Sequence, residues 1–335
     1  MSTGAITALP TDETVVSRAA VLLLVFNRPE LTARVLGAIR QARPPRLYIA
    51  ADGPRPSRPT DAALCRRTRE VCAQVDWECE VHHLYREGNL GCRAAVSSAI
   101  DWFFGREERG IILEDDVLPH PTFFSFCEHR LGQYESDESV MMVAGANPVA
   151  AFHHTSASHI LSPYGLVWGW ATWRTAWTRH DSEIRDWPEV RSHIRSLRYG
   201  GMSRTSLLMW RDILDELYHG RIDTWDFQWF LAIFRSRGFI VIPSQSLIEN
   251  IGYGDEATHT HGDRPPWVDK MRVVPHDERT ETQARGAVDH RFAELIERHV
   301  YLLRGSSFAR YVVKGAFRRL GVPGSFFTSL SRLLK

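Results

Sequence analysis

The sequence predicts an α/β fold with a mostly parallel, doubly wound sheet and a C-terminal helical extension. Between residues 20 and 114, apolar segments of strand length alternate four times with segments of helical periodicity. Several of the apolar segments end directly at a polar or acidic cluster. Alternation of this kind is typical of βαβ units, whose parallel strands are covered by helices on both faces. With 44% hydrophobic and 24% charged residues, the 335-residue chain has the composition of a globular protein, which excludes disorder over most of its length.

The expected elements follow one another in a regular order. The first strand, 20–26 (AVLLLVF), is wholly apolar, as strands buried on both faces are. Pro29 suits the first turn of the helix that follows. Strands are then expected at 46–51, 78–85 and 110–113, with helices at 61–73 and 93–104. After residue 145 the alternation weakens, and a helix over 222–238 and a buried strand over 239–243 are the clearest remaining elements.

Composition and charge also limit which domains and which binding partners are expected. We expect a flexible tail over 1–18, a catalytic domain over 19–262, and a basic helical extension over 263–335. A net charge of +1 argues against a dedicated nucleic-acid binder. No apolar run is long enough to span a membrane, no signal peptide is visible, and the five cysteines lack zinc spacing, so we expect reduced thiols and a cytoplasmic protein.

The C-terminal segment is basic and amphipathic. From residue 298 to residue 335 there are eight Lys or Arg residues and no Asp or Glu. Segments of this kind lie in the interface of anionic membranes, so we expect peripheral contact with the inner face of a membrane. A helix packed back on the domain is an equally good interpretation.

Polar residues gather where the predicted strands end. Asn27 and Arg28 follow the first strand, Asp52 follows the second, and the triplet Glu114, Asp115 and Asp116 follows the fourth. In parallel sheets, ligands bind beyond the carboxyl ends of the strands. Successive carboxylates there repel one another, and their oxygens suit Mn²⁺ or Mg²⁺. A solvated acidic turn is the alternative, but delivery of the triplet by an apolar strand favours a metal site.

Several segments, in order, resemble one enzyme family. EDDVLPHPTFF (114–124) followed by MMVAGAN (141–147) resembles the metal-binding segment of GT-A glycosyltransferases, which are nucleotide-diphospho-sugar transferases. The nearest likeness is to the inverting N-acetylglucosaminyltransferase I family, and the wider one is to bacterial enzymes of the class. The further matching segments are VFNRP (25–29), GLVWGW (165–170), WDFQW (225–229) and HTHG (259–262). The resemblance covers about residues 20–262 and implies a Rossmann-like GT-A fold.

The resemblance implies roles for individual residues. Asp116 would ligate the metal ion directly, and His259 would approach the metal or a phosphate. Asp226 would be the catalytic base, with Asp223 as runner-up because both fall near one face of the expected helix. Asp255 and Glu256 are weaker candidates for the base. Contacts to the donor are expected from Asn27, Arg28, Asp52, Arg93, Glu114, Asp115 and Trp170.

Structural alternatives remain for several of these residues. Asp226 would otherwise be a surface carboxylate, and His259 a polar residue of its loop. Arg28 and Arg93 would be ordinary surface arginines. Trp168 and Trp170 would belong to the core or to a hinge.

The predicted function is that of a metal-dependent inverting glycosyltransferase. It would move a sugar from a nucleotide-diphosphate donor, by family frequency a UDP-sugar, to a hydroxyl of a glycan, a lipid-linked saccharide or a small molecule. The divalent ion would neutralise the diphosphate leaving group, and a carboxylate opposite would deprotonate the acceptor. The alternatives are a nucleotidyltransferase that makes nucleotide sugars and a non-catalytic module that binds them. The absence of glycine from VFNRP counts against the nucleotidyltransferase.

Overall fold

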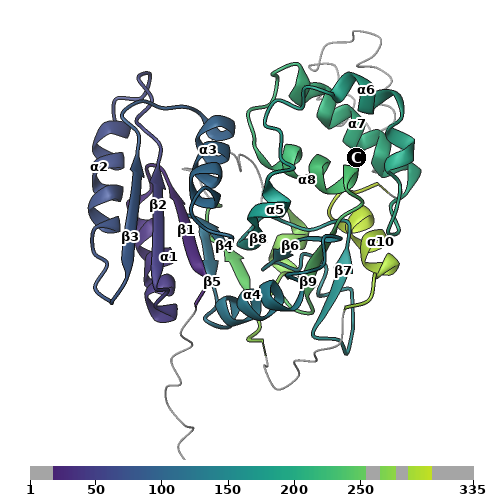
Figure 1. The fold of residues 1–335 in the computed structure, drawn as a ribbon, viewed down its shortest axis with the longest axis horizontal. Coiled ribbons are helices and arrows are strands. Elements are labelled where there is room, and N and C mark those ends of the chain that lie inside the picture. The colour runs from purple at the N-terminus through teal and green to yellow at the C-terminus, as the bar shows by residue number, and fades with distance from the viewer. Residues whose placement is uncertain (1–17, 254–264, 277–285, 304–335) are drawn as a thin grey trace, which may run out of the picture.

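The computed structural model describes residues 18–253, 265–276 and 286–303. Its centre is an eight-stranded mixed sheet in the order β3-β2-β1-β4-β8-β6-β9-β7, flanked by helices (Figure 1). The predicted α/β class is therefore confirmed. The first half of the chain supplies four parallel strands with helical crossovers between them. Its elements are β1 (Ala20–Val25), α1 (Pro29–Ala42), β2 (Arg46–Ala51), α2 (Asp61–Cys72), β3 (Glu80–Tyr85), α3 (Cys92–Phe104) and β4 (Arg109–Glu114).

The second half completes the sheet with mixed pairing. β8 runs antiparallel between β4 and β6, β9 runs parallel to β6, and β7 forms an antiparallel edge. β5 and β10 pair as a separate two-stranded sheet. The elements are β5 (Val117–Pro119), α4 (Thr122–Gln133), β6 (Val140–Ala144), β7 (His159–Ser162), β8 (Trp170–Trp173), α5 (Arg174–Trp177), α6 (Trp187–Ser192), a 3₁₀ turn (Ile194–Leu197), α7 (Arg204–Tyr218), α8 (Asp226–Arg235), β9 (Phe239–Pro243), β10 (Ile248–Asn250), α9 (Pro266–Lys270) and α10 (His290–His299).

Alternate residues of β1 enter two separate cores. Leu22 and Leu24 pack into the core shared with α3, α7, α8 and α10, whereas Val21 and Leu23 pack into the core shared with α1 and α4. This is the burial that a wholly apolar parallel strand requires, since side chains alternate between the two faces. All five cysteines are free thiols, as predicted.

Two boundaries differ from the sequence-based expectations. The helix expected over 222–238 begins only at Asp226, so Asp223 lies in the preceding loop and does not share a helix face with it. In the expected extension, Phe292 and Ile296 of α10 are buried in the core of the main domain, and the Asp289 N–H donates to the Leu161 carbonyl of β7 at 2.9 Å. The core therefore continues beyond residue 262.

Other expectations fall where nothing is described. The tail over 1–17 and the basic segment from residue 304 onward lie outside the described residues. None of the helices that the structure does describe has the length and apolar character needed to cross a membrane.

Candidate functional site

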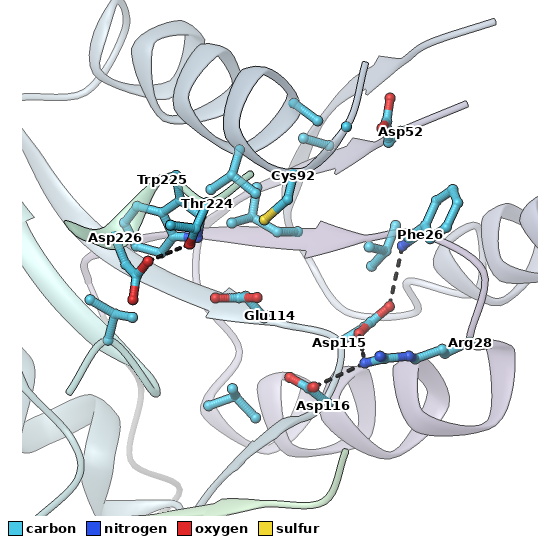
Figure 2. A pocket seen from close by; sticks show the side chains of 18 of the residues that line it. Phe26, Arg28, Asp52, Cys92, Glu114, Asp115, Asp116, Thr224, Trp225 and Asp226 are labelled. Carbon is cyan, nitrogen blue, oxygen red and sulfur yellow. Dashed lines mark hydrogen bonds and ion pairs between the residues drawn. The ribbon is translucent and has the colours of Figure 1, made fainter. Parts of the chain in front are cut away.

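A cavity of about 450 Å³ opens at the carboxyl edge of the parallel strands. It is walled by residues at the ends of β1, β2 and β4, by the first turns of α3, and by the segment that leads into α8 (Figure 2). The cavity therefore lies where the topology of a parallel sheet places ligands. The predicted residues that line it are Arg28, Asp52, Glu114, Asp115, Asp116 and Asp226, together with the runner-up base Asp223.

One wall consists of the acidic triplet and an arginine. β4 pairs with β1 so that Glu114 lies beside Leu24, which brings the carboxylates that follow close to the turn after β1. Arg28 Nη1 lies 2.9 Å from Asp116 Oδ2 and 3.4 Å from Asp115 Oδ1 (Figure 2). Asp115 Oδ2 also accepts the Phe26 N–H at 3.2 Å. Arg28 is thus a partner of the triplet and is not an ordinary surface arginine.

The triplet carries more negative charge than Arg28 offsets. Burial raises the pKa of Glu114 well above its usual range, and repulsion from Asp116, Asp115 and Asp226 raises it further. Burial and the Asp116 charge raise the pKa of Asp115 to about 7, although Arg28 opposes that shift. A divalent cation would relieve this repulsion, so the donor set fits Mn²⁺ or Mg²⁺.

In the part of the chain that the structure describes, protein side chains alone do not complete the coordination of a metal ion. No three His, Cys, Asp or Glu side chains are placed there to ligate one ion. An ion at Asp116 would therefore need further oxygen ligands from a bound phosphate group and from water. His259, the other predicted ligand, lies outside the described residues, as do Asp255 and Glu256.

Gly252 fixes the space around Asp116. A β-carbon at Gly252 would overlap the Asp116 carboxylate and would lie 2.7 Å from the Asp116 β-carbon. The neighbouring Ile251 N–H donates to the Asp116 carbonyl at 2.8 Å. Gly252 was not predicted from the sequence, because nothing local marks a glycine whose role is set by a residue in another segment.

The opposite wall carries Asp226. It is the first residue of α8, and the Thr224 hydroxyl donates to its Oδ1. In Figure 2, Glu114 lies between Asp226 on one side and Asp115 and Asp116 on the other. Glu114 and Asp226 both line the cavity, and the Asp226 charge contributes to the raised pKa of Glu114. Two sets of carboxylates therefore flank one cavity, the arrangement that a metal and a base on opposite sides of a substrate require.

The predicted tryptophan of the donor site lies in the core. Trp170 is fully buried and stacks on Trp225, with ring centroids 5.6 Å apart and an interplanar angle of 19°. It does not line the cavity, which corrects its expected role as a donor contact. Trp168 lines the cavity instead, and it stacks on Trp267 of α9 with centroids 5.4 Å apart. Of the two indoles in the Gly/Trp segment, Trp168 is therefore the one that lines the cavity.

The Asp223 carboxylate accepts hydrogen bonds from the start of α3. Its Oδ2 accepts the Cys92 N–H at 3.0 Å and its Oδ1 accepts the Arg93 N–H at 3.1 Å. Gly91 precedes these two residues with φ of 81°, and a β-carbon there would come within 2.8 Å of Asp223 Oδ2. The Arg93 guanidinium points to Glu183, at 3.7 Å, and does not line the cavity. The geometry therefore gives Asp223 a capping role.

Asp52 organises the loop that follows β3. Its Oδ1 accepts from the Gly53 N–H at 2.9 Å and from the Leu90 N–H at 3.1 Å, and its Oδ2 accepts from Asn89 Nδ2 at 2.9 Å. A β-carbon at Gly53 would overlap the backbone of Gly88. Asn89 lines the cavity, although the short segment around it carries no distinctive pattern.

Asn27 lies outside the cavity wall and contacts a residue behind it. Its side chain donates to Asp61 Oδ1 at 2.9 Å, and Asn27 is not part of the cavity wall. Asp61 in turn binds Arg55 Nε at 2.6 Å, and the Arg55 guanidinium lies 5.1 Å from the centre of the Phe26 ring. Phe26, Arg55 and Arg86, which the sequence analysis did not single out, all line the cavity.

No protein-family model matches the chain, and no curated protein does. Among solved structures, mouse xyloside xylosyltransferase 1 in its apo form is similar with a TM-score of 0.32 and 13% identity, over 66% of this chain and 82% of that chain. The UTP-bound UGPase from Acinetobacter baumannii has a TM-score of 0.31 and 10% identity, over 68% and 85%. The inositol-1-phosphate CTP transferase from T. maritima has a TM-score of 0.31 and 9% identity, over 50% and 75%. At these TM-scores none of the three assigns an activity to this chain.

Proposed function

We propose that the protein is a metal-dependent, inverting glycosyltransferase that uses a nucleotide-diphosphate sugar, of which a UDP-sugar is the first to test. The observation that carries the proposal is the cavity with Asp116 and Arg28 on one wall and Asp226 on the other. Glycosyl transfer with inversion needs these two functions on opposite sides of the sugar. One side neutralises the departing diphosphate, and the other removes the proton of the attacking hydroxyl.

The donor would lie over the ends of β1 and β2. This part of the cavity is lined by Phe26, Arg55, Asp52 and Asn89. Their aromatic ring, guanidinium, carboxylate and amide, respectively, could contact a nucleoside. The diphosphate would then reach Asp116, where a bound Mn²⁺ or Mg²⁺ supplies the positive charge that the leaving group needs. Glu114 and Asp115 shape the floor beside it.

Asp226 would act on the acceptor. The Thr224 hydroxyl donates to Oδ1 and orients the carboxylate, which would accept the proton of an incoming hydroxyl. Trp225 is buried beneath this turn and fixes its backbone through its stack on Trp170. Attack from this wall, opposite the diphosphate, is in line and inverts the anomeric carbon.

A saccharide acceptor fits the aromatic side of the cavity. Trp168 lines the wall, Trp267 stacks on it, and Tyr253 meets it edge-to-face with ring centroids 6.2 Å apart. Trp168 and Trp267 are half-buried, so part of each indole surface is accessible. Half-buried indoles offer broad apolar surfaces with a polar edge, which suit the faces of sugar rings. We therefore propose a glycan or lipid-linked saccharide as acceptor.

The nucleotidyltransferase alternative fits less well. Such an enzyme must hold a nucleoside triphosphate, normally with a flexible glycine-rich basic loop after the first strand. Here Pro29 begins α1 almost at once, and the Arg28 guanidinium is paired with Asp115 and Asp116. These residues form no glycine-rich loop for a triphosphate, whereas Asp116 would hold a divalent ion that neutralises a diphosphate.

The test is a screen of nucleotide sugars that measures nucleotide release with Mn²⁺, with Mg²⁺ and with excess EDTA. Asp116→Asn should reduce turnover by about 10²-fold or more. Asp226→Asn should reduce transfer by roughly 10²–10⁴-fold and leave donor affinity nearly unchanged. Asp76→Asn, at an exposed aspartate paired with Arg40, is the matched control. Full turnover in EDTA, retention of the anomeric configuration, or pyrophosphate release from a nucleoside triphosphate would each overturn the proposal.

A further inference from the structure

A second cavity, of about 410 Å³, lies at the opposite edge of the sheet. It is formed where β1, β2 and β4 begin and where β8 ends, and it shares no lining residue with the first cavity. Its charged lining comprises three glutamates and five arginines, which leaves two positive charges in excess. We call it the basal arginine pocket and define it by Arg18, Arg46, Arg106, Arg109 and Arg174.

Two of the arginines are balanced by carboxylates. Arg46 forms a bidentate pair with the buried Glu107, with distances of 2.7 and 3.0 Å, and the Tyr48 hydroxyl also donates to Glu107. Arg109 Nη1 lies 3.5 Å from Glu135 Oε1. Glu107 is therefore satisfied by its neighbours, and it is not available to neutralise the rest of the pocket.

The other three guanidinium groups have no carboxylate partner among the residues described. Arg174 Nε donates to the Glu107 backbone carbonyl at 3.0 Å. Arg106 Nη1 donates to the Trp102 carbonyl at 3.1 Å, and its guanidinium lies 5.3 Å from the centre of the Trp102 ring. At Arg18 the backbone N–H binds Glu128, while the guanidinium takes no part in that contact. Arg106 and Arg174 are thus positioned by backbone contacts, and neither forms an ion pair with the other two carboxylates that line the pocket, Glu108 and Glu128.

We propose that the basal arginine pocket binds a phosphate group, separately from the donor in the first cavity. Guanidinium groups present planar pairs of N–H donors that match the oxygens of a phosphate. Arg18, Arg106 and Arg174 come from three different segments and converge on one concave, mainly polar site. Its volume admits a phosphate together with part of the molecule that carries it. The group belongs either to a small phosphorylated ligand or to the headgroup of an anionic lipid.

The first arm of the test uses inorganic phosphate and pyrophosphate. Binding to the full-length protein is measured by calorimetry in excess EDTA, so that a metal-bridged complex at Asp116 does not contribute. Arg106→Gln, which alters an exposed side chain, should weaken binding by about tenfold, and Arg106→Gln combined with Arg174→Gln should abolish it. Arg185→Gln, at an arginine whose side chain is 82% exposed and outside the pocket, should have no effect.

The second arm distinguishes the two sources of phosphate. Vesicles of phosphatidylcholine alone and of phosphatidylcholine mixed with phosphatidic acid are sedimented with the wild-type protein and with each variant. Co-sedimentation that needs phosphatidic acid and is lost in the double variant assigns the pocket to a lipid headgroup. Binding of soluble phosphate that is lost in the variants, without such co-sedimentation, assigns it to a small ligand. If no binding in either arm depends on Arg106, the proposal is wrong, and this result leaves the proposed transferase activity untouched.

Discussion

Asp116 depends on contacts from two segments that are distant from it in sequence. Arg28 pairs with its carboxylate, Ile251 binds its carbonyl, and Gly252 leaves the space that the carboxylate occupies. Asp116 and Arg28 could be predicted because both follow apolar strands of the same sheet. Gly252 could not, because a glycine required by a close approach has no local signature when the approaching residue lies in another segment.

Gly252→Ala should therefore damage the metal site while the fold remains intact. The added methyl group would overlap the Asp116 carboxylate and force it to move. Displacement of a catalytic group by about 1 Å costs on the order of 10²-fold in rate. We expect kcat/KM to fall by that order and the Mn²⁺ concentration for half-maximal activity to rise. Gly132→Ala is the control, since a β-carbon there meets no atom within 4 Å. Equal activity of the two variants would contradict the role of Gly252.

Asp52 was predicted to contact the nucleotide, and in the structure its carboxylate also holds the loop that follows β3. Its carboxylate holds Asn89 and Leu90 against the end of β2, beside the cavity. Asp52→Ala should therefore loosen this wall and raise the apparent donor KM more than it changes kcat. Calorimetry with the donor would check this, with Asp76→Ala at an exposed position as control. Unaltered donor affinity would show that neither Asp52 nor the loop it holds forms part of the nucleotide site.

At the scale of elements, prediction succeeded where one local pattern sufficed. Strands β1, β2 and β4 are largely apolar because helices cover both faces of the sheet, whereas β3 (EVHHLY) lies at the sheet edge and is only partly buried. Helices α1 to α3 carry a periodic apolar face. β8 was missed because its four residues lie in a Gly/Trp-rich segment that favours a mobile loop. The helix expected from residue 222 starts late because Asp223 turns toward α3, and this long-range contact is invisible in the local pattern.

That contact makes Asp223 a stabilising link between two elements. The carboxylate satisfies the Cys92 and Arg93 N–H groups, which have no partner within α3. Asp223→Ala should lower the free energy of unfolding by about 1 kcal/mol, the usual effect of losing a cap. Urea denaturation would measure this, with Asp212→Ala in α7 as control. If the variant unfolds like the wild type but loses transfer as completely as Asp226→Asn, Asp223 is the base and the assignment is wrong.

Trp168, in the 165–170 segment, stacks on Trp267 of α9, and this pair leads to a prediction about acceptor binding. Trp267→Ala would remove the indole that supports Trp168. We expect the KM for a saccharide acceptor to rise by about tenfold, since an aromatic pair contributes roughly 0.5–1.5 kcal/mol beyond its buried area. Hydrolysis of the donor in the absence of acceptor should not change, because Trp267 does not line the cavity. An unchanged acceptor KM would place the acceptor elsewhere.

At the scale of the whole molecule, the candidate site joins the two halves of the chain. The first half supplies the acidic wall, and the second supplies Asp226, Trp168 and Gly252. Sequence analysis could predict the first part from strand ends, and it identified Asp226 through a family resemblance. It could not predict how the halves meet, and it therefore chose Trp170, which is buried in the core, over Trp168, which lines the cavity.

The excess of carboxylates should make the metal-free protein less stable as pH rises. The pKa of Asp115 is raised to about 7 by burial and by the Asp116 charge, whereas an unfolded aspartate titrates near pH ~4. Between these two values the folded chain retains a proton that the unfolded chain has released. The free energy of unfolding therefore falls as pH rises through that window, and the loss is complete above it. Glu114, whose pKa is raised for the same reasons, adds to the effect.

Asp115→Asn tests this directly, because it removes the charge and keeps an oxygen to accept the Phe26 N–H. In EDTA, the Tm of the wild type should fall between pH 5 and pH 8 by several degrees more than that of Asp115→Asn. Mn²⁺ should raise the wild-type Tm more at pH 8 than at pH 5, since the cation offsets charge that is present only when the carboxyl groups have ionised. Asp76→Asn is the control, because the pKa of Asp76 is lowered by Arg40 and the residue is ionised in both states across this range. Parallel pH profiles for the wild type and Asp115→Asn would show that repulsion within the triplet does not limit stability.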